Sequence, residues 1–542
     1  MVKTVEGEMH RSSRLALRAA LLGLLLVPSG YVAWQSRDMP QLGHLQDDGI
    51  YWVTAQSLAT GHGYRILSLP YRPWQTKYPP VYPAMLALIW RAQPHFPENL
   101  PYAALFSWLT LPLLLILARV FYQRLGLGEA HAWLLCGLLA LNVHVVHFSI
   151  SLMPELLFTS VLIGSILLAD ESRHTWTAAL SGCAAGAAYL IKAAALPLLL
   201  AGPALFLFRK DRQRALLFVA GMAPSVLGWQ WWVHQHLSPA VDDVAAFYTD
   251  YTGYRLYNVS WPDLPQLVWR NLNVLLTGLG ELLAMPDFGS ALGHLFPCLV
   301  ALIAFYGVVA LARRTQKLSL YYIFGLAMLP LLLIWHYPPG PRFSLPLLPL
   351  LLAGFTSAIR SLMRKAGEWL SSAAFPKRLA AASACVGVMA MVGVGLLSTY
   401  GFPLRLLTGL VSRDREELAS RREAYAWVGQ NVPPSSGLVT SEDAMAYLYT
   451  FQPASSFPTP PKLMYHDDLS GLANRYHSIT EFAARNHLHY LLLAQSDFLL
   501  ETDPDLARRL MEQMLADHSI FELVHQAGEV SIYRIRQDEP AS

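Results

Sequence analysis

The sequence predicts a mainly α-helical protein that crosses a membrane many times and carries a smaller soluble α/β domain at its C-terminal end. Three observations predict this. Of the 542 residues, 54% are hydrophobic and only 14% are charged, whereas a typical globular protein has about 25% charged residues. Long apolar runs recur through the first 400 or so residues, and many approach the roughly 20 residues that a bilayer-spanning helix needs. After Arg413 the composition becomes that of a soluble domain.

A transmembrane helical bundle of about 11 spans is therefore expected over residues 1–400. The expected spans are 15–36, 100–123, 130–149, 155–170, 176–192, 194–208, 215–234, 291–312, 318–336, 343–360 and 379–400. The first follows several basic residues, as a cleaved signal peptide would. It continues through Trp34 without a small-x-small cleavage site, so we interpret it as a retained span.

The basic residues between the spans fix the orientation, because loops on the cytoplasmic side are enriched in Lys and Arg. With the N-terminus in the cytoplasm, every basic cluster falls on that side, and an odd number of spans places the C-terminus outside. These clusters are Arg119/Arg124, Arg173, Arg209–Arg214, Arg313–Lys317 and Arg360–Arg378. We therefore expect a multi-pass protein of the plasma (inner) membrane with a periplasmic or extracytoplasmic C-terminal domain.

Four outer segments follow from this orientation: the first outer loop (37–99), a loop near 235–290, the turn at 337–342, and everything after 401. In the first outer loop, residues 49–59 and 80–90 show short helical patterns. Both are too short to span, so we expect them to lie along the membrane interface.

The C-terminal segment, 401–542, is expected to form an outer-face soluble α/β domain. Strand patterns occur at 437–440, 489–494, 521–525 and 530–535, with helical patterns at 416–428, 480–487 and 505–517. Its cluster of polar residues at 465–468 is interpreted as a solvated loop.

Composition excludes some classes of function. The net charge of +3 is too small to indicate nucleic-acid binding. All four cysteines lie in apolar runs, which is typical of small core residues and not of a disulfide framework or metal site. They are Cys136, Cys183, Cys298 and Cys385.

The strongest candidate for chemistry is the pair Asp47-Asp48, placed just beyond the first span. One of these acids can serve as an N-terminal cap for the helix at 49–59. A cap accounts for one acid and leaves its neighbour unexplained, so a catalytic role is expected for at least one of the two. Lys77, in the sequence Lys77-Tyr78-Pro79-Pro80, can be a snorkelling interfacial lysine, or a point charge aimed at a phosphate.

Three further charged residues are expected at the same membrane face. Glu155 opens the fourth span, where an acid also suits the helix dipole. Lys192 lies where two spans meet, and Arg342 opens the tenth span after a Pro-rich turn. An ionisable residue in such a position is a functional candidate, and a guanidinium can bind phosphate bidentately. The convergence of acids and cations on one face is more informative than any one of them.

These motifs resemble those of the GT-C superfamily, and within it the protein O-mannosyltransferase and lipid A aminoarabinose transferase group. The resemblance rests on Asp47-Asp48-Gly-Ile-Tyr51, Lys77-Tyr-Pro79-Pro80, Leu152-Met-Pro154-Glu155 and Arg342-Phe-x-x-Pro346, and covers about 40–400 in layout. It implies that Asp47 is the catalytic aspartate, with Asp48 where a Glu is usual and Glu155 as a second acidic residue. It also implies that Lys77, Lys192 and Arg342 lie near the donor phosphate.

The implied function is transfer of a hexosyl or pentosyl group from a polyprenyl-phosphate donor to an acceptor lipid, glycan or protein at the outer face. Asp47 would act as general base with Asp48 or Glu155 orienting the acceptor, and Lys77 and Arg342 would stabilise the leaving phosphate. One displacement of this kind inverts the anomeric centre.

No cofactor or metal is predicted, although Asp47, Asp48, Glu155 and His44 have oxygen and nitrogen ligands that could hold a divalent cation. Two other functions stay open: a secondary transporter, which would favour charges near the bilayer midplane and repeated halves, and a cell-envelope polysaccharide polymerase or ligase. The sugar, the acceptor and the lipid length are not readable from the sequence.

Overall fold

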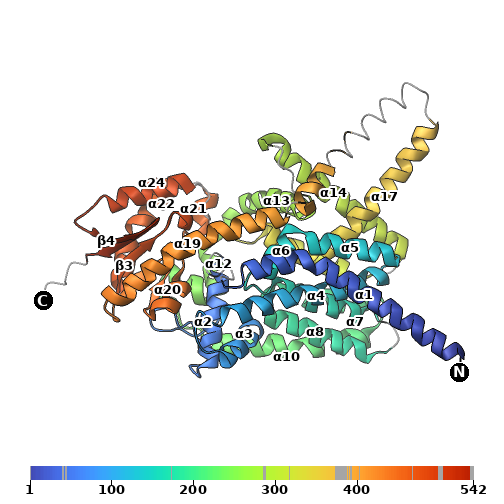
Figure 1. Ribbon diagram of the computed structural model, residues 1–542, viewed down its shortest axis with the longest axis horizontal. Coiled ribbons are helices and arrows are strands. Elements are labelled where there is room, and N and C mark those ends of the chain that lie inside the picture. The colour runs from blue at the N-terminus through green and yellow to red at the C-terminus, as the bar shows by residue number, and fades with distance from the viewer. Residues whose placement is uncertain are drawn as a thin grey trace.

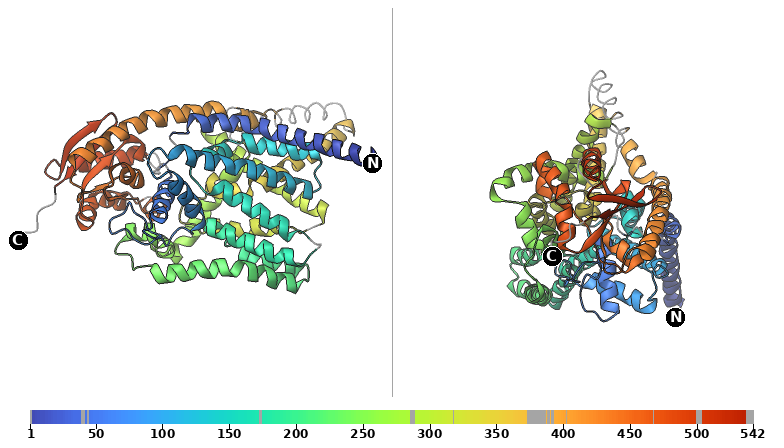
Figure 2. Two further views of the ribbon diagram at one scale, coloured as in Figure 1. Left: turned by 60° about the horizontal axis from the view of Figure 1, so that its bottom comes forward. Right: turned by 90° about the vertical axis from the view of Figure 1, so that its left-hand side faces the viewer.

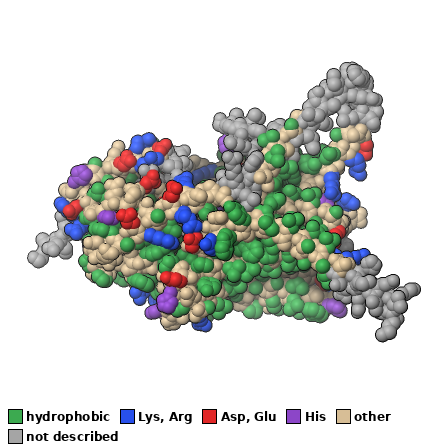
Figure 3. All heavy atoms as spheres, in the orientation of Figure 1, with side chains coloured by type: hydrophobic (Ala, Val, Ile, Leu, Met, Phe, Trp, Pro, Cys, Tyr) green, Lys and Arg blue, Asp and Glu red, His purple; other side chains and the backbone are tan. Residues whose placement is uncertain are grey.

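The computed structural model describes residues 2–38, 42, 45–171, 174–284, 289–316, 318–372, 387, 390, 393–401, 403–466, 468–498 and 504–536. It is a bundle of helices at one end and a small sheet packed with helices at the other, and the first helix begins at the end of the bundle far from the sheet (Figure 1). Hydrophobic side chains gather over the bundle, and charged ones are more frequent over the sheet region (Figure 3).

The first half of the chain contains two short helices near the sheet region and a series of apolar helices. They are α1 (Val2–Gln35), α2 (Asp47–Ala59), α3 (Val81–Ala92), α4 (Leu100–Arg124), α5 (Glu129–Leu141), α6 (Val143–Ile150), α7 (Glu155–Ala169), α8 (Trp176–Ile191), η1 (Ala193–Ala195), α9 (Leu198–Phe208) and α10 (Arg212–His236).

The second half continues the bundle and then enters the sheet region through one long helix. The elements up to that helix are α11 (Asp243–Thr249), α12 (Tyr251–Asn258), η2 (Trp261–Asp263), α13 (Leu264–Glu281), α14 (Gly289–Thr315), α15 (Leu320–Leu333), α16 (Pro341–Ser344), η3 (Leu345–Leu347), α17 (Leu348–Ser372), η4 (Leu397–Gly401) and α19 (Pro403–Asn431). Figure 2 shows α1 and α19 on the same side of the bundle, where Arg415 of α19 pairs with Asp38.

Fewer helices than expected are long enough to cross a bilayer alone. By length and hydropathy, five described helices qualify, or six when α5 and α6, bent by 59°, count as one span. Helices α7 and α8 have 15 and 16 residues, below the roughly 20 that the hydrocarbon requires. The count of 11 is thus not confirmed, and most of the expected span 379–400 lies outside the described residues.

The bundle has a polar layer at each end. Helix α7 begins at Glu155, which binds Lys192 and Arg342. Its other end is followed by Asp170, which binds Arg209. The same end holds ion pairs of Arg119 and Arg124 with nearby glutamates. Arg119, Arg124 and Arg209 therefore lie at the opposite end of the bundle from Glu155, Lys192 and Arg342.

The sheet region has five strands, in the order β2-β1-β3-β5-β4. The three strands β2, β1 and β3 are parallel, and β5 pairs antiparallel with β3 and β4. The bounds are β1 (Gly437–Val439), β2 (Ala454–Ser455), β3 (Leu488–Leu493), β4 (Phe521–Ala527) and β5 (Val530–Ile535), with α20 (Asp443–Thr450), α21 (Pro461–Tyr465), α22 (Leu469–His477), α23 (Ile479–Arg485), η5 (Gln495–Phe498) and α24 (Pro504–Leu515) between them.

Four of these strands match the expected ones, and the two-residue strand β2 is additional. The solvated loop expected at 465–468 is wrong for Tyr465, which is buried and donates a hydrogen bond to the carbonyl of Asn258. Residue 467 lies outside the described residues. His466 approaches Asp263 at 3.2 Å, so this turn is packed against the 235–290 loop.

The sheet region packs directly on the first outer loop. The backbone N–H of Ala454 in β2 donates to the carbonyl of Ser68 at 2.8 Å, and α20 lies against α2. Consequently α2 is buried on most of its sides. The sequence had predicted a helix lying along the membrane interface with a single apolar face. The contact places the N-terminal turn of α2 between the bundle and the sheet.

Candidate active site

The first turn of α2 gives the two adjacent acids different surroundings. The helix begins at Asp47, not at Gly49, and the residue before it, Gln46, makes no side-chain cap. Asp48 is fully buried, and its Oδ1 accepts a hydrogen bond from the N–H of Gly49 at 2.9 Å. The side chain of Asp47 keeps 20% of its surface exposed. Asp47 is thus the acid of this pair that a substrate can reach.

Two groups distant in sequence hold the Asp47 carboxylate. The Tyr78 hydroxyl donates a hydrogen bond to Oδ1, and Nη2 of Arg342 donates to Oδ2. Burial alone would raise the pKa of Asp47, but the charges of Arg342 and Lys77 and the bond from Tyr78 outweigh it and hold the pKa below its usual value. Asp47 is therefore ionised, as a proton acceptor must be.

Glu155 collects two cations at the start of α7. Lys192 Nζ and Arg342 Nε each lie 2.8 Å from its Oε1, and the side chain is fully buried. Oε2 has no hydrogen-bond partner within the described residues. Lys192 reaches this position because it adopts an extended conformation at the end of α8. Arg342 thus connects Asp47 to Glu155, and the four side chains balance two negative and two positive charges.

Lys77 lies beside this group without joining an ion pair of the described residues. Its backbone N–H donates to the side-chain oxygen of Gln75 at 2.9 Å, and its ammonium lies 4.0 Å from the centre of the Phe247 ring. Burial lowers the pKa of Lys77 to about 8, against a raising effect of Asp47 and a further lowering by Arg342. A cation held in this way retains its charge at neutral pH and is available to an incoming anion.

The structure brings in residues that the sequence did not indicate. His336 is buried, and its pKa is lowered to about 3 by burial and by the nearby charges of Lys77 and Arg255. Tyr251 of α12 also lies near the site, since the charges of Asp47, Arg342 and Arg255 act on its hydroxyl. Arg255 itself is half-buried and forms no ion pair in the described ranges. Lys77, whose charge is partly offset by the nearby Asp47, and Arg255 are therefore two cations close to His336 that form no ion pair among the described residues.

A signal for this part of the site was present in the sequence. Asp242 and Asp250 each begin a short helix, α11 and α12, by accepting a backbone N–H bond of 2.7 Å from a residue three positions later. Such acids are recognisable caps. Recognising these two caps in the sequence would have predicted that Arg255 lies on a helix and not in an irregular loop.

No three His, Cys, Asp or Glu side chains in the described part of the chain converge as metal ligands. His44, which the sequence suggested as a possible ligand, lies outside the described residues. Asp47, Asp48 and Glu155 are held instead by the groups named above.

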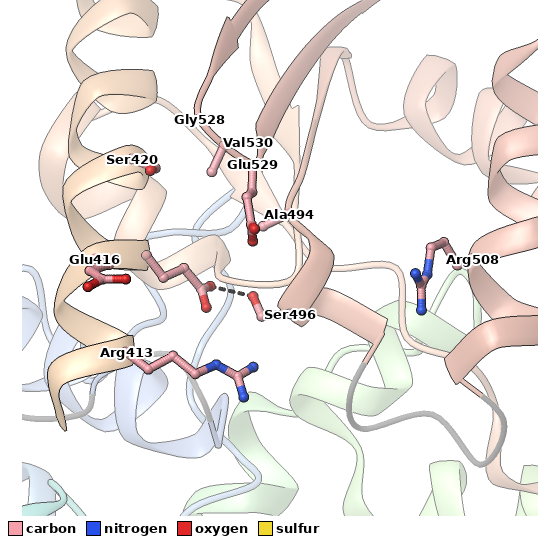
Figure 4. Close-up of a pocket in the computed structure, with 10 residues that line it drawn as sticks. Arg413, Glu416, Ser420, Ala494, Ser496, Arg508, Gly528, Glu529 and Val530 are labelled. Atoms are coloured by element: carbon pink, nitrogen blue, oxygen red, sulfur yellow. Dashed lines mark hydrogen bonds between the residues drawn. The ribbon is translucent and has the colours of Figure 1, made fainter. Parts of the chain in front are cut away.

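A separate cavity lies in the sheet region, at the ends of β3 and β5 beside α19 (Figure 4). It has a volume of about 400 Å³ and is lined by Arg413, Glu416, Glu417, Ser420, Ala494, Ser496, Arg508, Gly528, Glu529 and Val530. None of these is a predicted site residue. Next to it, Arg421 is buried among Glu417, Glu442 and Asp497, which stabilises the joint between α19 and the sheet.

The sequence matches no family model and no curated protein. Solved structures do resemble it. The apo form of ArnT from Cupriavidus metallidurans has a TM-score of 0.50 at 14% identity, and the match covers 95% of this chain and 98% of that one. The Archaeoglobus fulgidus oligosaccharyltransferase, tethered with an acceptor peptide, gives 0.49 at 12% identity over 91% of this chain and 72% of that one.

ArnT is a GT-C glycosyltransferase. At this identity the likeness concerns the fold, and it extends over nearly the whole length of both ArnT and this chain. Together with the apolar helices, it identifies an integral membrane protein. The resemblance expected from the motifs is confirmed at the level of architecture: the chain has the fold of the GT-C glycosyltransferases.

Proposed function

We propose that this protein is a membrane glycosyltransferase that moves a sugar from a polyprenyl-phosphate donor to an acceptor hydroxyl or amine at the outer face of the inner membrane. The observation that carries the proposal is the assembly of Asp47, Arg342, Glu155, Lys192 and Lys77 at one end of the bundle. A lipid phosphate must keep its chain in the bilayer while its head group reaches water, so a site at the helix ends suits it.

The reaction is a single displacement at the anomeric carbon. Asp47 accepts the proton of the acceptor as the new bond to carbon forms. The bond from that carbon to the phosphate oxygen breaks, and its electron pair leaves with the phosphate. The products are the inverted glycoside and free polyprenyl phosphate. Cations aimed at the departing phosphate provide electrostatic stabilisation, often the largest contribution to catalysis.

We assign the donor phosphate first to Lys77 and Arg255, because neither forms an ion pair among the described residues, and Asp47 acts on Lys77 only at longer range. Arg342 remains a third ligand for the phosphate, but it is already paired with Asp47 and Glu155. A donor phosphate that draws Arg342 away from Asp47 would remove one cause of the low pKa of that carboxyl. Donor binding would thereby make Asp47 a stronger base.

Glu155 and Asp48 then serve as supports. Glu155 is fully buried and fixes Lys192 and Arg342, and Asp48 is bonded to the backbone of α2. The position of the charges at the end of α7 also differs from the midplane sites of secondary transporters, which favours the transferase over that alternative.

Product analysis tests the proposal. Purified protein in vesicles would be given polyprenyl-phosphate sugars, and mass spectrometry would follow the release of free polyprenyl phosphate together with glycosylated acceptor. Lipid extracts of cells with and without the protein would identify which sugar to supply. Donor consumption without a glycosylated product would indicate hydrolysis, and unchanged lipid-linked sugars in both tests would contradict the proposal.

A further inference from the structure

We infer that the sheet region is a working part of the active site: Tyr248 and Ser456 hold Gln46, and Gln46 sets the position of the Asp47 carboxylate. This rests on the proposed function, because it takes Asp47 as the base. It assigns Tyr248 and Ser456 as positioning residues, which act through Gln46.

The backbone before Asp47 is held in a strained turn. Gln46 has φ 59° and ψ −45°, and the N–H of Asp47 donates to the carbonyl of Leu45 at 2.6 Å. This is a γ-turn with a positive φ, a rare and strained form. A strained conformation persists only where the surroundings impose it. The turn fixes the direction in which α2 starts, and therefore where Asp47 points.

The surroundings that impose this turn come from two other parts of the chain. Gln46 Nε2 donates to Ser456 Oγ at 2.5 Å and lies 3.5 Å from the Tyr248 hydroxyl. That hydroxyl accepts the N–H of Ser456 at 3.0 Å and lies 2.6 Å from its Oγ. Tyr248 belongs to α11, and Ser456 follows β2 of the sheet. Since Tyr248 and Ser456 are both buried, water does not replace these bonds when one is removed.

A second set of contacts joins the sheet region to the first turn of α2 and to Tyr248. Asp443, at the start of α20, interacts with the hydroxyls of Tyr248 and Ser68. Its neighbour Ala444 lies so close to α2 that a Cβ added at Gly49 would stand 2.8 Å from the Ala444 Cβ. Real Cβ atoms do not approach so closely, and neither methyl can swing aside. Gly49 therefore lets the sheet region seat directly on the helix that carries Asp47.

The consequence is a coupling between the sheet region and the chemical step. A carboxylate misplaced by about 1 Å can cost around a hundredfold in rate. Donor binding should be largely unaffected, because no hydrogen bond or ion pair among the described residues joins Gln46 to Lys77 or Arg255. Loss of the positioning contacts should therefore lower kcat and leave the KM for the donor unchanged.

Two sets of variants test this. Ser456→Ala removes the shared oxygen between Gln46 and Tyr248, and kcat should fall between about tenfold and a hundredfold. Gly49→Ala should lower kcat through the clash with Ala444, although alanine is the better helix former. The double variant Gly49→Ala/Ala444→Gly removes the clash and should recover most of the activity. Size-exclusion profiles show that each protein is folded, and binding of a labelled polyprenyl phosphate reports the phosphate site.

The results separate the possible outcomes. The inference is overturned if the kcat of Ser456→Ala is normal. It is also overturned if folded Gly49→Ala loses activity and the added change Ala444→Gly does not restore it. In either case, transfer by the wild-type protein leaves the proposed function intact. If Gly49→Ala does not fold, the kcat of Ser456→Ala alone tests the inference. If a variant loses affinity for polyprenyl phosphate by the same factor as it loses kcat, the positioning role is also contradicted, because the whole active site has then been disrupted. Wild-type protein without transfer activity overturns the proposed function itself.

Discussion

Asp47 and Arg342, 295 positions apart in the sequence, form an ion pair at one end of the helical bundle. The same guanidinium binds Glu155 through its Nε at 2.8 Å, so a single side chain aligns an accessible carboxylate with a buried one. This pairing keeps Asp47 ionised in the resting site. It also makes Arg342 the point at which a bound anion could change the basicity of Asp47.

The kcat/KM for the donor should fall at alkaline pH, because Lys77 loses its charge there. Burial lowers the pKa of its ammonium to about 8. Below that pH the side chain is charged and attracts the lipid phosphate; above it, the charge and the attraction are lost. The wild-type kcat/KM for the donor should thus fall by up to about tenfold per pH unit above 8.

The variant Lys77→Arg tests this assignment, because arginine stays protonated throughout the accessible range. Its absolute rate will differ, since a guanidinium does not match the ammonium in shape. The test is the shape of the profile of kcat/KM against pH. An alkaline limb near pH 8 that persists in Lys77→Arg would assign that limb to another group.

Arg255→Gln should weaken donor binding. The side chain carries a charge that no carboxylate of the described residues neutralises, close to Lys77 and His336. Loss of a charge-assisted hydrogen bond to phosphate costs about 1.5–3 kcal/mol, so the donor KM should rise by at least tenfold with a smaller change in kcat. Titration with labelled polyprenyl phosphate measures the affinity directly. Arg534→Gln, at an exposed arginine of β5, is the control, and equal effects of the two changes would refute the assignment.

Glu155→Gln should destabilise the protein. It removes the common partner of Lys192 and Arg342 in a fully buried position, and breaking a buried pair in this way costs about 3–5 kcal/mol. Thermal unfolding in detergent should show a marked loss of stability, partly recovered by Glu155→Gln/Lys192→Gln. The control Glu368→Gln breaks an exposed pair with Arg364, which is worth about 0–1 kcal/mol. Similar melting temperatures for the two single variants would contradict the role given to Glu155.

Asp443 should make the stability of the protein depend on pH. Burial raises the pKa of its carboxyl from 3.8 to about 7. An acid with a raised pKa binds its proton more tightly in the folded state, so its favourable contribution is full below pH 4 and disappears as the pH rises to 7. Wild-type protein should lose a few kcal/mol over this range relative to Asp443→Asn. Parallel stability curves for the two proteins between pH 4 and 7 would disprove this.

The general architecture and the charged residues that meet at one end of the bundle could be predicted from the sequence, and the reason is physical. Apolar length and the distribution of Lys and Arg are local properties that the bilayer imposes, so they can be read without a structure. Four of the five strands were likewise visible as local patterns. Their pairing order and the two-residue strand β2 depend on contacts across the fold.

Other features could not be derived in that way. The single span expected at 130–149 is divided, because α5 and α6 meet at Asn142 at an angle of 59°. The sequence assigned no role to Tyr78, which stands between Lys77 and the prolines, yet its hydroxyl donates to Asp47. Whether Arg342 faces a phosphate or a carboxylate depends on a partner nearly 300 positions away.

The most direct test of the account is the rate of sugar transfer by Asp47→Asn in vesicles that contain a polyprenyl-phosphate sugar and its acceptor. An amide cannot accept the proton, so transfer should fall by about 10²–10⁴-fold, while the variant folds and binds polyprenyl phosphate. Asp505→Asn, at an exposed aspartate of α24, should transfer at the wild-type rate. Transfer by folded Asp47→Asn within a few-fold of wild type would contradict the central claim that this carboxylate is the base.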